Sequence, residues 1–218
     1  MIWPFGEAAL LVDLPDAAAA QALAAALRSD PPEGVIAVIP GRASVLVELD
    51  PLAADPDIVA DALAPIRLDP TALVGRLRTV PVVYGETFGP DLEEVARLAS
   101  LSPAEVVEMH TATELRVLFG GFAPGFAYLG EVAAPLRVSR LATPRTVTPA
   151  GSVALADGMS GIYPADLPGG WRVIGRTPLT FFDPRREPPA YLVPGDRVRF
   201  VAMTADAWED HRGPAADW

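Results

Sequence analysis

Residues 143–184 are TPRTVTPAGSVALADGMSGIYPADLPGGWRVIGRTPLTFFDP, a series of short apolar runs separated by glycine and proline. Runs of this length between turn residues predict β-strands. The expected strands are SVAL, GIYP, WRVIG and LTFF, followed by YLV and RVRFV on either side of the turn PGD. Frequent turns and little helical pattern are typical of a barrel. We therefore predict a closed or nearly closed β-barrel.

The segment before this series is a strand that runs into a shaped loop. Residues 113–119, TELRVLF, alternate in the manner of a strand, and residues 120–130, GGFAPGFAYLG, follow. Glycine and proline at this density exclude both helix and regular strand. The rings of Phe122, Phe126 and Tyr128 have two interpretations, which the sequence leaves open. They line a ligand pocket, or they plug one end of the barrel.

The N-terminal region has a different pattern. Apolar runs predict strands and helices in the order β-α-β-β-α between Glu7 and Pro65. This is most of a ferredoxin-like domain, and the sequence leaves a generic α/β sandwich open as the alternative. A weakly patterned stretch, Leu68–Arg78, follows. We expect an α/β domain, a barrel domain and a flexible tail. Their expected limits are residues 1–76, 77–205 and 206–218. The fold class is therefore α+β.

Two short helices are expected between the first barrel strand and the strand at 113–119. One begins at Pro90, with acidic residues in its first turn. The other begins at Ser102, where Pro103 and Glu105 complete the pattern of a capping box. This second helix is expected to end near His110. The His110 side chain is then either a C-terminal cap or a catalytic base. The sequence does not decide between these two roles.

Composition excludes several classes of protein. The net charge is −11 and the pI is about 4.6, which argues against nucleic acid or an anionic membrane as a partner. The chain has no cysteine, and all 17 basic residues are arginine, so a lysine Schiff base, a thiol nucleophile and a zinc finger are excluded. With only two histidines, a histidine-based metal site is not expected. The N-terminus lacks the features of a signal peptide, and we expect a cytoplasmic protein.

Arginines lie beside the glycine-rich turns of residues 143–184. A guanidinium group and exposed backbone amides suit a small carboxylate or phosphate, although any single arginine here is compatible with a plain surface charge. The arginines of this segment are Arg145, Arg172 and Arg176. We expect these turns and the aromatic loop to meet at one mouth of the barrel, in a single cavity for a small anion.

Several long motifs resemble one known family. They are VPVVYGETFGPDLEEVA, VVEMH, LFGGFAPGFAYLG, TPAGSVAL, SGIYPADLPGGW, IGRTPLTFFDP and PGDRVRF, dense from Thr79 to Val201. In order and spacing they resemble the family of the 5-oxoprolinase B subunit, also called the KipI or allophanate hydrolase subunit 1 family. The resemblance implies a small α/β domain followed by a cyclophilin-like barrel. It also implies a hydrolase complex that consumes ATP, with Mg²⁺ as a cofactor, to convert 5-oxo-L-proline to L-glutamate.

That resemblance implies partners and site residues as well. The partners are the larger 5-oxoprolinase C subunit, which is like KipA or allophanate hydrolase subunit 2, and the A subunit of the same enzyme. Candidate catalytic residues are His110, Arg145 and Arg176. Candidate substrate-binding residues are Phe122, Pro124, Gly125, Phe126, Tyr128, Pro149, Ser152, Tyr163, Gly169, Gly170, Trp171 and Thr177. One departure is Met159, where the family usually has glutamine, so an amide is lost.

Two alternative functions stay open from the sequence. One is a KipI-like regulator that inhibits a sensor histidine kinase. The other is a subunit of the carboxyltransferase type that processes urea or allophanate. Isomerase activity inferred from the barrel alone would rest on fold analogy only.

Overall fold

A computed structural model describes residues 1–64, 66 and 75–218. The chain divides into two compact units, residues 1–74 and residues 75–218. Residues 68–74 of the weakly patterned stretch lie outside the described residues. Within the described part, no helix is long and apolar enough to span a membrane.

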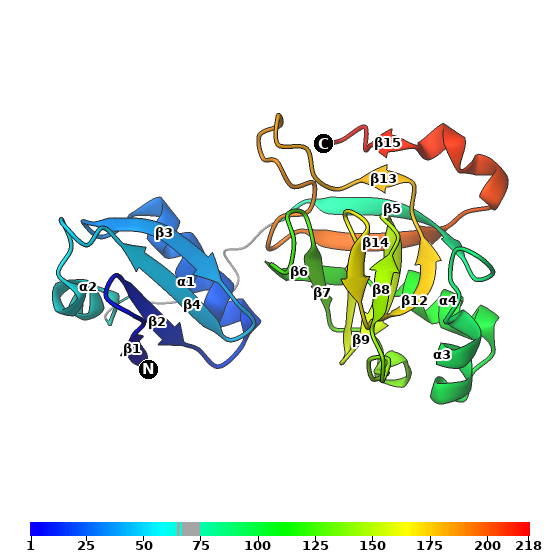
Figure 1. Ribbon diagram of the computed structural model, residues 1–218, viewed down its shortest axis with the longest axis horizontal. Coiled ribbons are helices and arrows are strands. Elements are labelled where there is room, and N and C mark those ends of the chain that lie inside the picture. Colours follow the sequence, from blue (N-terminus) through cyan, green and yellow to red (C-terminus); the bar gives the residue numbers. More distant parts are fainter. Residues whose placement is uncertain (65, 67–74) are drawn as a thin grey trace. The chain divides into compact units, whose positions relative to one another are not determined.

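The first unit is a four-stranded antiparallel sheet with two helices (Figure 1). The expected β-α-β-β-α order is present, and an additional strand, β1, pairs with β2 at one edge. The strand order is β1-β2-β4-β3. The elements are β1 (Ile2–Pro4), β2 (Ala9–Asp13), α1 (Ala17–Ser29), β3 (Val35–Pro40), β4 (Ser44–Leu49) and α2 (Pro56–Leu63).

Alternation along the strands gives this unit its core. In β4, Val45, Val47 and Leu49 are buried, and the residues between them are partly exposed. These side chains form one cluster with Leu23 and Leu27 of α1. Burial of apolar side chains on one face of the sheet is the main source of stability for such a layer.

The second unit contains a closed seven-stranded barrel, as the sequence predicts. Its strand order is β10-β7-β6-β14-β5-β12-β9, and pairing of β9 with β10 closes it. The barrel strands are β5 (Leu77–Tyr84), β6 (Leu115–Gly120), β7 (Ala127–Gly130), β9 (Ser152–Ala156), β10 (Met159–Ile162), β12 (Arg172–Arg176) and β14 (Arg197–Ala202). Two small sheets lie outside the barrel, formed by β8 (Arg145–Thr148) with β11 (Leu167–Gly169), and by β13 (Leu179–Thr180) with β15 (Gly213–Pro214).

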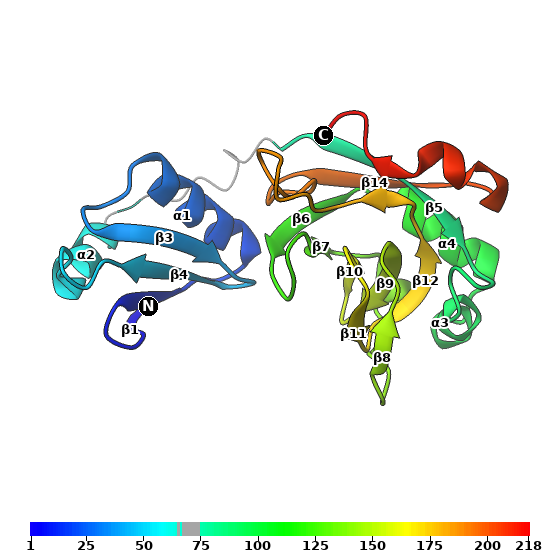
Figure 2. The same cartoon turned by 45° about the horizontal axis from the view of Figure 1, so that its top comes forward.

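Two helices pack beside the barrel, α3 (Leu92–Ala99) and α4 (Pro103–Ala112) (Figures 1 and 2). The predicted capping box of α4 is present, because the Ser102 side chain accepts from Glu105 N and the Glu105 carboxylate accepts from Ser102 N. Helix α3 begins at Leu92 rather than at the predicted Pro90. Asp91, at its N-cap position, makes no capping bond, because its carboxylate binds elsewhere in the fold.

The predicted strand YLV is not a strand. Tyr191 and Leu192 are buried in the core of the barrel unit, but their segment forms only an isolated bridge between Phe182 and Ala190. The apolar residues therefore belong to the core, whereas the predicted backbone pairing is wrong. A buried turn segment and a short buried strand have the same apolar signature.

The expected flexible tail is instead packed against the barrel. Arg78 donates to the Asp217 carboxylate at 2.8 Å, and the Tyr191 hydroxyl donates to it at 2.8 Å. The Arg186 guanidinium lies 4.7 Å from the centroid of the Trp218 ring. The partners of Asp217 and Trp218 are distant in sequence, so a polar C-terminal segment gives no local signal of these contacts.

Candidate functional site

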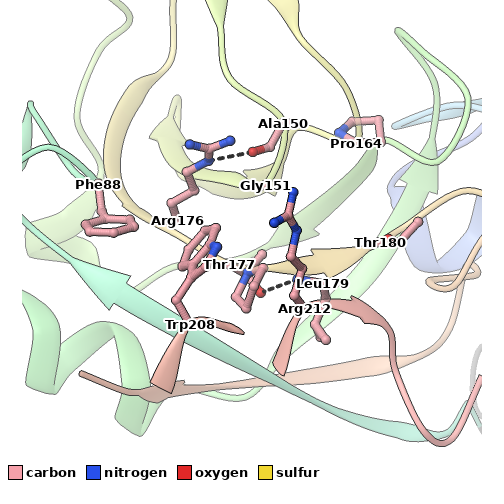
Figure 3. Close-up of a pocket in the computed structure, with 11 residues that line it drawn as sticks. Phe88, Ala150, Gly151, Pro164, Arg176, Thr177, Leu179, Thr180, Trp208 and Arg212 are labelled. Atoms are coloured by element: carbon pink, nitrogen blue, oxygen red, sulfur yellow. Dashed lines mark hydrogen bonds between the residues drawn. The ribbon is translucent and has the colours of Figure 1, made fainter. Parts of the chain in front are cut away.

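A hollow of about 430 Å³ opens where β12 ends (Figure 3). We call it the Arg176 hollow. Its lining is Phe88, Ala150, Gly151, Pro164, Arg176, Thr177, Pro178, Leu179, Thr180, Trp208 and Arg212. This lining contains two arginines and no carboxylate, in a chain whose net charge is −11. Its volume is in the range of small-molecule sites.

Backbone contacts between two turns fix the shape of this hollow. Thr177 N donates to Gly151 O at 2.9 Å, which joins the end of β12 to the turn before β9. Gly151 has φ +81, and a Cβ at this position would collide with the Thr177 carbonyl oxygen. Only glycine therefore fits the turn without a shift of the backbone.

The Arg176 side chain is held by one of its nitrogens. Its Nε donates to Ala150 O at 2.7 Å, and its guanidinium lies 5.5 Å from the centroid of the Trp208 ring. No carboxylate among the described residues forms an ion pair with it. Its terminal amino groups are therefore available as a fork for a planar oxyanion.

The second hollow is small and aromatic. This aromatic hollow, of about 100 Å³, is lined by Phe122, Phe126, Tyr128, Arg140, Tyr163, Pro168, Gly169, Gly170 and Trp171. The Phe126 ring meets its neighbours edge to face, with centroids 5.3 Å from Tyr163 and 5.8 Å from Trp171. Phe126, Tyr163 and Trp171 are buried in one cluster, whereas Phe122 is 59% exposed. Of the three rings of the loop, Phe126 is therefore part of the core, Tyr128 packs partly buried against it, and Phe122 is exposed.

The two hollows share no lining residue, so the expectation of a single cavity is wrong. The reason is the direction of β12. Trp171 immediately precedes this strand and Arg176 ends it. At roughly 3.3 Å per residue the two positions are about 16 Å apart along the chain. Sequence proximity within the motif suggested a shared site, but an extended strand separates them.

His110 lies inside the barrel unit and lines neither hollow. It is 1% exposed, and hydrogen bonds join its Nδ1 to the Tyr84 hydroxyl at 2.8 Å and its Nε2 to Ser160 Oγ at 3.1 Å. Its ring stacks on Phe200 with centroids 4.4 Å apart. Burial lowers the pKa of His110 to about 3 and raises the pKa of Tyr84. This neutral imidazole bonds to Tyr84 and Ser160 and not to the last carbonyls of α4, so it is not a C-terminal cap, and it lies away from both hollows.

Arg145 is also occupied by structural contacts. Its Nη2 donates to the Asp91 carboxylate at 2.5 Å, and its Nη1 donates to Trp171 O at 3.3 Å. Asp91 is buried and also accepts from Val173 N at 2.6 Å. Because a buried carboxylate needs these donors, the pair joins α3 to β8 and β12. We therefore do not retain Arg145 or His110 as site residues.

Of the five remaining predicted residues, one lines a hollow and four do not. Thr177 lines the Arg176 hollow, and Pro149 and Ser152 flank the Ala150–Gly151 turn that borders it. Pro124 and Gly125 belong to the aromatic loop, where Gly125 packs closely on Phe182. Neither residue lines a described hollow.

Met159, which stands where the family usually has glutamine, lies in the core and lines neither hollow. Met159 is 6% exposed and packs in the cluster that contains Phe126 and Trp171. It begins β10 directly after the turn at Asp157 and Gly158, both of which have positive φ. An apolar side chain suits this buried position, whereas an amide would need hydrogen-bond partners there.

Sequence reasoning missed three important residues. Phe88, Trp208 and Arg212 all line the Arg176 hollow. The Phe88 and Trp208 rings pack with centroids 5.1 Å apart. A tryptophan in the otherwise polar sequence ADAWEDHR was the one available signal, because a large ring usually needs a packing surface.

Comparison with known proteins agrees with the motifs. A relative from Bacillus subtilis (strain 168), named as the B subunit of 5-oxoprolinase, is 48% identical over 129 residues, which cover 59% of this chain and 54% of the relative. A relative of the same name from Escherichia coli O157:H7 is 50% identical over 126 residues, covering 58% of each. The chain therefore spans little more than half of the length of these curated relatives.

Solved structures extend the likeness over nearly the whole chain. TTHA0988 is 34% identical with a TM-score of 0.79, covering 94% of this chain and 40% of that one. The conserved uncharacterized protein PH0987 from Pyrococcus horikoshii is 38% identical with a TM-score of 0.60, covering 95% of this chain and 100% of that one. The K. lactis urea amidolyase, at 18% identity, shares the fold with a TM-score of 0.76, covering 96% of this chain and 15% of that one.

These findings confirm the resemblance to the family of the 5-oxoprolinase B subunit. The model of the family described as carboxyltransferase domain, subdomain C and D, matches residues 1–192. That match includes the whole first unit and most of the barrel. The chain belongs to the carboxyltransferase domain, subdomain C and D, family.

Proposed function

We propose that this chain is one component of an ATP-dependent 5-oxoprolinase, which hydrolyses 5-oxo-L-proline to L-glutamate together with the larger C subunit and the A subunit. The names of the curated relatives support this activity. The observation that carries the proposal for this chain is the Arg176 hollow, which has two guanidinium groups and no carboxylate in its lining. The same end of β12 carries the family-like motif IGRTPLTFFDP.

The substrate has one carboxylate on a compact lactam ring. We propose that the terminal amino groups of Arg176 bind this carboxylate, since the Nε is already bonded to Ala150 O. Thr177 Oγ1 accepts from Leu179 N at 3.3 Å, which leaves its hydroxyl proton free to donate to the substrate. Pro164 and Pro178 supply apolar walls for the ring methylenes.

ATP enters this proposal as a co-substrate of the complex. A lactam amide is a poor electrophile, and transfer of a phosphoryl group to its oxygen makes the carbon susceptible to attack by water. The described residues include no group of three or more His, Cys, Asp or Glu side chains that could hold a metal ion. We propose that Mg²⁺ arrives with the nucleotide, and that the complex works in the cytoplasm, where ATP is available.

We also propose finer assignments of fold. In the first unit, α1 connects β2 to β3, and β4 lies between these two strands in the sheet. This is the arrangement of a split βαβ unit. It supports a ferredoxin-like description, with β1 in the place of the fourth strand. For the second unit, the closed seven-stranded barrel supports the cyclophilin-like description.

Co-expression with the A and C subunits tests the proposal. The complete complex is expected to hydrolyse ATP only when 5-oxo-L-proline is present, and to release one glutamate for each ADP. A complete complex that shows no stimulation by 5-oxo-L-proline would count against the proposed function. In that case, inhibition of a sensor histidine kinase by the chain would favour the regulatory alternative.

The family description favours one second candidate. A carboxyltransferase domain suggests a subunit that processes urea or allophanate with a biotinylated carrier protein. The likeness to urea amidolyase supports only the fold for this candidate. This second candidate would be favoured if the complex turned over urea and left 5-oxo-L-proline unreacted.

A further inference from the structure

We propose that the C-terminal segment, residues 205–214, completes an oxyanion site in the Arg176 hollow, with Arg212 as the second cation beside Arg176. The ligand would be a carboxylate or phosphate group. That the natural ligand is 5-oxo-L-proline or ATP rests on the proposed function. Trp208 and Arg212 lie beyond residues 1–192, so the family match does not assign them a role.

The first support is the charge of the hollow. Arg176 and Arg212 both line it, and their guanidinium groups are directed toward the turn at Ala150 and Gly151 (Figure 3). The only ion pair of Arg212 among the described residues is an exposed one, with Glu209 at 3.3 Å. Two cations around one hollow repel each other, and a bound anion relieves that repulsion.

The second support is that the fold fixes the position of Arg212. The following residue, Gly213, donates its N–H to Pro178 O at 3.2 Å, and β15 pairs in parallel with β13. Because Pro178 is two residues after Arg176, this pairing holds both arginines at one place. Figure 1 shows β15 beside β13.

The third support is the position of Trp208. The Trp208 ring contacts the Phe88 ring, with centroids 5.1 Å apart. The Arg176 guanidinium lies 5.5 Å from the centroid of the Trp208 ring. A guanidinium group stacked on an aromatic face keeps its edge nitrogens free for hydrogen bonds. Trp208 therefore orients Arg176 toward the interior of the hollow and is a positioning residue.

Three residues beyond this segment, Asp217 binds to the barrel unit. Burial alone would raise the pKa of Asp217, but hydrogen bonds from Arg78 and Tyr191 lower it below its usual value. Both oxygens of the carboxylate are used, in bonds of 2.8 Å each. This contact restrains the segment that carries Arg212 and Trp208.

Calorimetric titration of the full-length chain tests the proposal directly. The probes are 5-oxo-L-proline, inorganic phosphate, ATP and 2-pyrrolidinone, the lactam that lacks the carboxylate. We expect one of the three anions to bind and 2-pyrrolidinone not to bind. The anion that binds identifies the source of the oxyanion. Failure of all three anions to bind overturns the proposal, whereas the assay of the complete complex reports on the 5-oxoprolinase function separately.

Three variants locate the bound anion. Arg212→Ala is expected to weaken binding at least tenfold, and Arg176→Ala at least as much, because each removes a charge-assisted hydrogen bond. The matched control is Arg97→Ala, since Arg97 has 70% side-chain exposure and an i,i+3 ion pair, like Arg212 with 68%. Unchanged affinity in Arg212→Ala, with loss in Arg176→Ala, would overturn the role of the segment. Equal loss in Arg97→Ala would show a nonspecific charge effect and overturn it too.

Discussion

Acid should destabilise the barrel unit through His110. The imidazole has an ordinary pKa of 6.5 in the unfolded chain, and burial lowers it to about 3 in the folded protein. Between these values the unfolded state binds a proton that the folded state does not, so stability falls as the pH falls from 6.5 toward 3. At pH 5, about 1.5 units below the ordinary pKa, the loss is about 2 kcal/mol.

Denaturant unfolding of the full chain at pH 7 and pH 5, followed by fluorescence, measures this loss. His110→Gln should be less stable than the wild type at pH 7, because the ring contact with Phe200 is lost. Between pH 7 and pH 5, the free energy of unfolding of this variant should fall by about 2 kcal/mol less than that of the wild type. His211→Gln is the matched control, since it removes the other histidine of the chain, which is exposed. Equal acid sensitivity in wild type and His110→Gln would refute the assignment of a neutral buried imidazole.

Three further substitutions test the structural contacts, each by the change in unfolding free energy. Asp91→Ala removes the acceptor of Arg145 and of Val173 N, and should cost about 3 kcal/mol; a cost below about 1 kcal/mol would contradict the buried pair. Gly151→Ala should cost about 2–3 kcal/mol, because of its positive φ and the collision with Thr177, and wild-type stability would contradict that turn. Ser102→Ala removes the cap of α4 and should cost about 1 kcal/mol, with no effect on anion binding.

Local signals predicted most of the fold. The capping box at Ser102 and the alternation of β4 are written in a few adjacent residues, and the structure contains both. The parallel pairing of β14 with β5 brings Val198 beside Arg78, and no local pattern encodes such a contact. The edge strand Ile2–Pro4 was not predicted because three residues with a proline are too short to show a period.

The site was harder to predict than the fold. Arg176 and Thr177 were identified from glycine-rich turns and motif likeness, and both line the larger hollow. Arg145 has the same sequence context, but it pairs with Asp91, which is 54 residues away in the chain. Which arginine stays free therefore depends on where the carboxylates fold. Arg212 was missed for the same reason, since only tertiary packing brings it to the hollow.

The most direct test of the proposed substrate site is the steady-state kinetics of the complete complex with Arg176→Ala and with the control Arg97→Ala. If Arg176 binds the substrate carboxylate, Arg176→Ala should raise the KM for 5-oxo-L-proline at least tenfold, with little change in the KM for ATP. Arg97→Ala should behave as the wild type. An Arg176→Ala complex with the wild-type KM and kcat for 5-oxo-L-proline would contradict the claim that this hollow is the substrate site.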